Sequence, residues 1–252
     1  MNGNHNQGSR RFYTLDYLRG TFVGLMIVFH FCFLLADYRF VSFDFYRDPF
    51  WLHSRTFIVS GFLTIVGISL VLANRNGFNP KSYFRRLGLL VCYAALVSIS
   101  TYIQVGERWI YFGILHFIAV ASVLGLVFLP FTWLNIVMGI ILVTGGNLYS
   151  NPLFDLPWLH WVGLMTHKPL TNDYVPLLPW FGVVLMGIGM GRLIVTSSSA
   201  KLMRVLSWHS RRLPFPILNF FGRQAIHVYI LHVPIILGLI EGYLWLSPSG
   251  NG

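Results

Sequence analysis

Charge is scarce in this sequence. Only 10% of the 252 residues are Asp, Glu, Lys or Arg, whereas 55% are hydrophobic and the mean hydropathy is +0.64. Because soluble domains carry about 25% charged residues, this composition excludes an ordinary water-soluble protein. Cysteine is scarce too: Cys32 and Cys92 fall in separate hydrophobic runs, and two thiols make no disulfide framework. With no internal repeat and no second domain in the sequence, we predict a single integral-membrane domain over residues 1–252.

Hydrophobic runs of about 20 residues, the length that spans a hydrocarbon core of about 30 Å, recur along the chain. They predict an all-α, polytopic bundle of about seven transmembrane helices, at 16–37, 50–73, 85–104, 109–129, 131–148, 177–196 and 218–246. A cytoplasmic N-terminus leaves most of the 18 Lys and Arg residues inside, and Asp16 is then the only acidic residue on that side. The basic balance therefore indicates topology and contact with anionic lipid rather than nucleic-acid binding.

The first hydrophobic run, LDYLRGTFVGLMIVFH, contains Arg19 and His30. An Arg at mid-helix costs about 2.5–3.5 kcal/mol on insertion scales, so it needs a partner, an aqueous cavity or a function. Eleven residues are close to three helical turns, which puts Arg19 and His30 on one face about 16 Å apart. Arg19 is then at the cytoplasmic interface, where Asp16 or lipid phosphate are alternative partners, and His30 is either functional or a hydrogen-bonded core histidine.

Two further histidines reach a similar depth. His116 in FGILHFIA and His232 in VYILHVPI are placed on other helices at about the level of His30, which predicts one polar site inside the bundle. His227 is turned to a different face and is interpreted as structural. Asp37 follows His30 by two turns on nearly the same face, where it could orient an imidazole or meet a substrate hydroxyl.

These positions describe a tunnel across the membrane. Its cytoplasmic mouth is cationic and its outer vestibule is acidic and aromatic, because residues 149–176 mix Trp with Asn and Asp; an interfacial aromatic belt remains the alternative interpretation of that segment. Cations can hold phosphates, and a neutral imidazole can deprotonate a hydroxyl or an amine. Such a layout would let an acyl donor from the cytoplasm meet an acceptor on the outer side.

Glycines recur at small-xxx-small spacing, at Gly20 and Gly24 and again at Gly187 and Gly191. This spacing is typical of helices that pack closely in membranes, so we predict close helix contacts at all four positions.

Five segments together resemble a known family: LDYLRGTFVGLMIVFH, FLTIVGISL, YFGILHFIA, DYVPLLPWFGVVLMGIGMG and FGRQAIHVYILHVPI. The chain resembles the bacterial branch of the heparan-α-glucosaminide N-acetyltransferase catalytic-domain family. It is also similar to the membrane acyltransferases that O-acetylate polysaccharides, whose first helix carries Arg, ten residues and then His. The resemblance implies transfer of an acetyl group from acetyl-CoA across the bacterial inner membrane to a glycan, with His30 as the catalytic histidine and Arg19 in a polar cluster on the CoA side.

The resulting hypothesis gives each candidate residue a role. We predict catalytic roles for His30, His116, His232 and Asp173, contacts to acyl-CoA for Arg19, Arg85, Arg86 and Arg223, and contacts to the acceptor for Asp37, His53, Arg55 and Trp180. The expected partners are the lipid bilayer, acyl-CoA and a glycan or other envelope acceptor, with a homo-oligomer possible and no metal site.

Two other functions are compatible with the same residues. A proton-coupled transporter of an anionic solute could use the same histidines as a relay, and its transport would depend on a pH gradient without chemical change in the solute. A haem-binding electron carrier could use two histidines at one depth as axial ligands, and it would show a Soret band.

Overall fold

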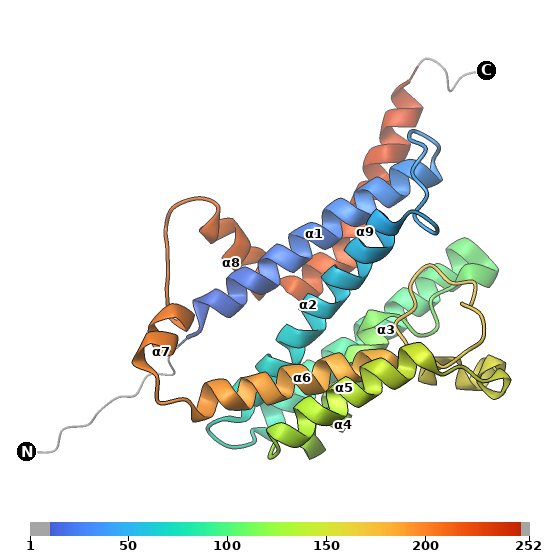
Figure 1. Cartoon of the computed structure of the whole chain (residues 1–252). Helices are drawn as coiled ribbons and strands as arrows, with labels where there is room; N and C mark the ends of the chain where they lie inside the picture. The colour runs from blue at the N-terminus through green and yellow to red at the C-terminus, as the bar shows by residue number, and fades with distance from the viewer. Residues whose placement is uncertain (1–10, 248–252) are drawn as a thin grey trace, which may run out of the picture. The chain divides into compact units, whose positions relative to one another are not determined.

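The computed structural model describes residues 11–247, and within them the chain is helical with no β-strand (Figure 1). The α-helices are α1 (Tyr13–Asp37), α2 (Pro49–Asn74), α3 (Pro80–Val105), α4 (Ile114–Phe128), α5 (Trp133–Leu148), α6 (Leu177–Thr196), α7 (Ala200–Leu206), α8 (Phe215–Arg223) and α9 (Ala225–Leu246). Short 3₁₀ helices follow α3 and α5, namely η1 (Gly106–Arg108), η2 (Pro152–Asp155) and η3 (Pro157–Val162). The expected all-α membrane bundle is confirmed.

Five segments of the described chain are long and apolar enough to cross a membrane: α1, α2, α3 with its 3₁₀ extension, α6 and α9. The apolar helices α4 and α5 are shorter, with 15 and 16 residues. At 1.5 Å per residue each covers about 23 Å, less than the hydrocarbon core of about 30 Å. The total of seven spans and the cytoplasmic N-terminus therefore stay predictions.

Several helices differ from the expected ones: α3 begins at Pro80 rather than at residue 85, the short α7 was not expected, and two further helices have other boundaries. The helix expected at 109–129 begins only at Ile114, because Gly113 caps it with an extended backbone. The helix expected at 218–246 is two helices: α8 ends at Arg223, Gln224 leaves helical geometry (φ −100°, ψ 18°), and α9 begins at Ala225. Hydropathy averaged over an apolar run does not detect a break of one residue. The sequence prediction therefore treated α8 and α9 as one helix.

The chain forms two compact units. The first contains Met1–Ile58 and Ser197–Gly252, and therefore α1, the start of α2, α7, α8 and α9; the second is Val59–Thr196. The single domain expected over residues 1–252 stays a prediction.

In the first unit α1 packs on α8 and α9 (Figure 1). Buried Leu34 meets Ile236 and Ile240 of α9 in a hydrophobic core. At Gly20 the backbones of α1 and α8 touch, because a Cβ there would lie 1.9 Å from the Leu218 carbonyl oxygen. Gly24 has nothing within 4 Å of such a Cβ, so the close packing expected at Gly24 is wrong.

In the second unit α6 packs on α5, on α4 and on the later part of α2. Gly187 and Gly191 lie on the α2 side, with ideal Cβ positions 2.4 Å from the Thr64 carbonyl oxygen and 3.1 Å from Ile68, so close packing there is confirmed. The fully buried Asn135 amide donates hydrogen bonds to the carbonyls of Phe128 and Phe131 and fixes the α4–α5 turn.

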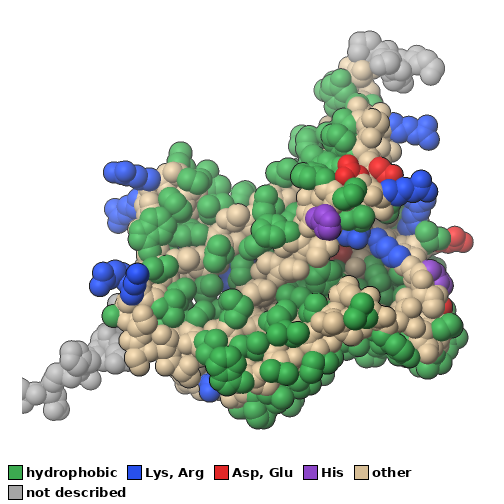
Figure 2. Space-filling view, in the orientation of Figure 1, with side chains coloured by type: hydrophobic (Ala, Val, Ile, Leu, Met, Phe, Trp, Pro, Cys, Tyr) green, Lys and Arg blue, Asp and Glu red, His purple; other side chains and the backbone are tan. Residues whose placement is uncertain are grey.

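Large hydrophobic side chains are exposed along the helices, and green side chains cover much of the face seen in Figure 2. On α3, for example, Ile99 is 60% and Ile103 is 76% exposed. Exposed apolar side chains repeated along a helix suit contact with lipid tails, so these helices need no further protein cover.

Candidate functional site

His30 of α1 and His232 of α9 are in direct contact. Nε2 of His232 lies 3.3 Å from Nδ1 of His30, and the ring centroids are 4.9 Å apart. His232 is 94% buried, whereas His30 is half-buried. The two helices that the sequence placed at one depth therefore bring their imidazoles together. His116 belongs to the second unit, and its place in a common histidine layer stays a prediction.

Backbone carbonyls fix where each imidazole carries its proton. Nδ1 of His232 lies 2.6 Å from the Tyr229 carbonyl oxygen, and Nδ1 of His30 lies 2.9 Å from that of Met26. A carbonyl oxygen only accepts, so both Nδ1 atoms carry hydrogen when the rings are neutral. His30 Nδ1–H then points to both the Met26 carbonyl and His232 Nε2, which leaves the lone pair of His30 on Nε2. This is the arrangement of a general base whose far nitrogen is already hydrogen-bonded.

The same contact bears on haem ligation. Two axial nitrogens on one iron stand about 4 Å apart, since each metal–nitrogen bond is about 2 Å. The 3.3 Å contact between His30 and His232 is a hydrogen bond with no room for an iron between the two nitrogens. The geometry therefore favours a proton-sharing pair over axial ligation by these two atoms.

At the other end of α1, Asp16 holds two arginines. Its Oδ1 accepts from Arg19 Nη1 at 3.0 Å and its Oδ2 accepts from Arg11 Nη2 at 2.8 Å. Arg19 Nη1 also lies 3.2 Å from the Gly222 carbonyl oxygen of α8. Two guanidinium groups on one carboxylate leave an excess positive charge at this end of α1, while the planar fork of Arg19 is held in a fixed orientation.

The other predicted donor-side cations are distributed over both units. Arg223 ends α8 directly after Gly222, so it lies beside the residue that Arg19 contacts, and it is exposed. Arg85 and Arg86 are exposed in the second turn of α3, in the second unit. Their sharing of a mouth with Arg19 stays a prediction.

Asp173 and His116 meet at the start of α4. Asp173 Oδ2 accepts from the Ile114 N–H at 2.9 Å, and His116 Nδ1 accepts from the Gly113 N–H at 3.3 Å. His116 Nε2 then carries the hydrogen and lies 3.1 Å from Ser98 Oγ, which donates to the Ile110 carbonyl. These contacts satisfy N–H groups that a helix start leaves unpaired, so both side chains have a capping role in the structure.

A polar cluster in the second unit lies outside the long helices. The Tyr111 hydroxyl lies 3.1 Å from His160 Nδ1, and the Tyr174 hydroxyl donates to the His160 carbonyl. Burial raises the pKa of Tyr111 to about 12 and raises that of Tyr174 as well. Hydrogen bonds from Thr166 lower the pKa of Asp155, with a smaller contribution from the nearby His167. Sequence reasoning singled out Asn, Asp, His and Trp residues of 149–176 but neither Tyr174 of that segment nor Tyr111.

The residues predicted to contact the acceptor are distributed over both units. Asp37 lines an open pocket at the C-terminal end of α1, together with residues of the following loop. His53 and Arg55 lie on the first turns of α2, His53 exposed and Arg55 half-buried, and neither is among the residues that line this pocket. Trp180 is half-buried on α6 of the second unit.

Asp37 is the lining residue of this pocket that sequence reasoning singled out, and Arg39 is one of those that it missed. Arg39 has a left-handed backbone (φ 61°), with its N–H bonded to the Ala36 carbonyl and the Phe40 N–H bonded to that of Leu35. This pair of bonds is a Schellman motif with Arg39 at the position where glycine is usual. A left-handed residue other than glycine costs about 1–2 kcal/mol, which no composition or hydropathy pattern reveals.

Comparison with known proteins gives one family. The family model described as heparan-alpha-glucosaminide N-acetyltransferase, catalytic, matches residues 11–234. No curated protein and no solved structure matches this chain significantly. The matched range contains α1 to α8, His30 and His232.

Proposed function

Because this chain belongs to the heparan-alpha-glucosaminide N-acetyltransferase catalytic-domain family, we propose that it is a membrane acetyltransferase that uses acetyl-CoA from the cytoplasm and acetylates a glycan acceptor on the outer side. The family's name supports glucosamine as the first acceptor to test. The bacterial inner membrane is the proposed location, following the sequence resemblance. The observation that carries the proposal is the His30–His232 pair between the apolar helices α1 and α9.

In this proposal His30 is the general base. Its Nε2 takes a proton from the acceptor amine or hydroxyl as that atom attacks the thioester carbonyl. The new bond to the acetyl carbon forms, the carbon–sulfur bond breaks, and His30 returns the proton to the departing CoA sulfur. His232 Nε2 accepts a hydrogen bond from His30 Nδ1 throughout and so stabilises the imidazolium that forms.

The donor end is proposed at the start of α1. Arg19 is held by Asp16 and by the Gly222 carbonyl, and the exposed Arg223 adds charge at the same end of α8. Phosphates of acetyl-CoA fit a site where arginines outnumber the single carboxylate. The roles of Arg85 and Arg86 in holding the donor are part of the same proposal.

The test uses the full chain in phosphatidylcholine nanodiscs with acetyl-CoA and glucosamine, and it measures acetylated sugar by mass spectrometry and released CoA with a thiol reagent. Removal of a general base costs about 10²–10⁴-fold, so His30→Ala should lose at least a hundredfold in kcat while still binding acetyl-CoA. His232→Ala should lose less, because it removes only the supporting hydrogen bond. His227→Ala, on the same helix as His232, is the matched control and should retain activity.

Binding of the donor is measured separately by calorimetry with acetyl-CoA and with dephospho-CoA. Arg19→Ala should weaken binding of acetyl-CoA, and His30→Ala should not. Full turnover in a folded His30→Ala variant would falsify the base assignment. Failure of the folded wild-type protein to bind any CoA species would remove the acetyltransferase proposal and return the proton-coupled transporter as the better explanation.

A further inference from the structure

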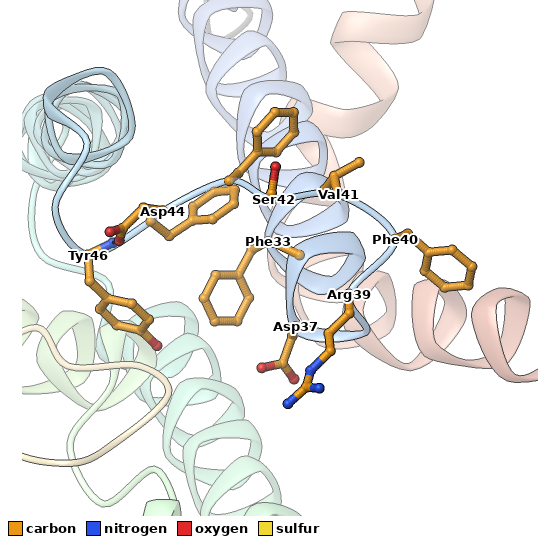
Figure 3. A pocket seen from close by; sticks show the side chains of 11 residues that line it. Phe33, Asp37, Arg39, Phe40, Val41, Ser42, Asp44 and Tyr46 are labelled. Carbon is orange, nitrogen blue, oxygen red and sulfur yellow. The ribbon is translucent and has the colours of Figure 1, made fainter.

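The pocket at the C-terminal end of α1 has a volume of about 730 Å³ and lies wholly within the first unit. Its lining comes from Phe33 to Tyr46, that is, from the last turns of α1 and the loop before α2. Figure 3 shows the Phe33 and Tyr46 rings and the carboxylate of Asp37 bordering one space, with Arg39 beside Asp37. A cavity of this size can hold a sugar unit or more.

The lining combines aromatic rings with charges of both signs. The Phe33 and Tyr46 ring centroids are 6.4 Å apart with the rings nearly perpendicular, and Tyr46 is 66% exposed. An aromatic face covers the apolar face of a pyranose, while a carboxylate and a guanidinium bind its hydroxyl groups. A surface that met only the acyl chains of lipids would gain nothing from the charges of Asp37 and Arg39.

The charged side chains of the pocket have two different roles: one stabilises the loop, and the other two have no hydrogen-bond or ion-pair partner of their own in the described structure. Asp44 Oδ1 accepts from the N–H groups of Tyr46 and Arg47, so Asp44 shapes the turn that presents Tyr46. Within residues 11–247 the structure gives the side chains of Asp37 and Arg39 neither a hydrogen-bond nor an ion-pair partner. Asp37 and Arg39 are therefore the charged groups that a ligand would meet.

The backbone at Arg39 is a second and independent observation. Glycine is the usual residue at this position of a Schellman motif, and an arginine there is conformationally unfavourable. Strained non-glycine residues cluster at ligand-binding sites, where the side chain contributes what the backbone costs. A long cation beside Asp37, in a pocket wall, fits this pattern.

The pocket also has a defined relation to His30. His30, Phe33 and Asp37 have i, i+3 and i+7 spacing, which places them along one stripe of α1. Phe29, in ring contact with His30, also meets Phe45 of the pocket. Seven residues rise about 10.5 Å along a helix, more than the width of one sugar ring, so the unit in the pocket is not the one at His30.

We propose that this pocket binds the pyranose unit next to the one that is acetylated, so that the protein prefers acceptors of two or more sugar units. The inference rests on the proposed function, because the reacting sugar is placed at His30. Phe33 and Tyr46 stack on the neighbouring unit, and Asp37 and Arg39 bind its hydroxyl groups.

The test compares glucosamine with its β-1,4-linked dimer and trimer. Binding is measured by saturation-transfer NMR and calorimetry on the full chain in phosphatidylcholine nanodiscs, without donor and without sugar-based detergent, since a maltoside headgroup would compete for the pocket. One good contact is a factor of about ten in affinity, so the dimer should bind at least about tenfold more tightly than glucosamine. Tyr46→Ala, Asp37→Asn and Arg39→Gly should each reduce that preference for the dimer.

Matched controls come from the same loop. Asp48→Asn removes a nearby charge outside the pocket and keeps the oxygen that accepts from the Phe50 N–H. Phe50→Ala removes an aromatic ring that is 65% exposed and does not line the pocket. Both controls should retain the preference for the dimer. Arg39→Gly should melt no lower than wild type, which separates its binding role from a folding role.

Equal affinity for glucosamine and its dimer, or a dimer preference that survives in folded Tyr46→Ala and Asp37→Asn proteins, overturns the neighbouring-unit site. Acetyl-CoA binding is measured on the same samples and should be unchanged in all pocket variants. Normal donor binding with no dimer preference rejects the pocket alone, whereas absent donor binding rejects the proposed function.

Discussion

Adding one methyl group at Gly20 should separate α1 from α8 and loosen Arg19. The new Cβ would lie 1.9 Å from the Leu218 carbonyl oxygen, and a tolerable contact is at least 3.0 Å, so the helices must move apart by 3.0 − 1.9 = 1.1 Å. The same shift would lengthen the 3.2 Å contact from Arg19 Nη1 to the Gly222 carbonyl oxygen beyond hydrogen-bonding range. Overpacking costs about 1–3 kcal/mol and a lost hydrogen bond to a charged group about 1.5–3 kcal/mol.

The gain in helix propensity offsets about 1 kcal/mol, so Gly20→Ala should destabilise the protein by about 2 kcal/mol or more. For a chain of this size that corresponds to a fall in Tm of about 4 °C or more, measured by intrinsic fluorescence in nanodiscs. Gly24→Ala is the control on the same helix, because its Cβ meets nothing within 4 Å; it should melt at or above the wild-type temperature. A Gly20→Ala protein that melts like Gly24→Ala would refute the backbone contact between α1 and α8.

Three other predictions concern separate contacts. Asp173→Ala should lower the free energy of unfolding by about 1 kcal/mol through loss of the α4 cap, whereas Asp173→Asn should keep the stability; a loss of turnover in Asp173→Asn would then mark a catalytic carboxylate. The pKa of Asp155 is lower in the folded protein than in the unfolded chain, where it is near 3.8. The hydrogen bonds from Thr166 to Asp155 therefore stabilise the fold fully at a pH above 3.8, and this stabilisation is lost as the pH falls through the pKa of the folded protein. A ¹³C titration of Asp155 with a midpoint at or above 3.8 would contradict this. Arg39→Ala should melt below Arg39→Gly, by the equivalent of about 1–2 kcal/mol, and equal melting temperatures would argue against strain at Arg39.

The position of α1 followed closely from the sequence because length and hydropathy determine it. The run from Asp16 to Asp37 matches α1, and the contact between His30 and His232 agrees with depths calculated from the helix rise. The ion pair of Arg19 with Asp16, one of two alternatives from sequence, follows from spacing within one helix.

Contacts between distant segments did not follow from the sequence. Asp173 reaches the start of α4 from a loop 59 residues further along the chain, and nothing in the local pattern reports that partner. Gly20 and Gly24 have the same local spacing, but only Gly20 faces α8. The strained turn at Arg39 could not be predicted from the sequence either, because Tyr38, Arg39 and Phe40 are not residue types that favour turns.

The turn after α1 also has a consequence for how this chain can change over time. A binding site and a stable fold can place different demands on one residue. At Arg39 they oppose each other, because glycine would relax the backbone while removing the guanidinium from the pocket. Variants of this protein selected only for thermal stability should therefore acquire glycine at position 39. Variants selected for acetylation of long acceptors should retain arginine. The outcome of such a selection would measure what the pocket contributes to the living cell.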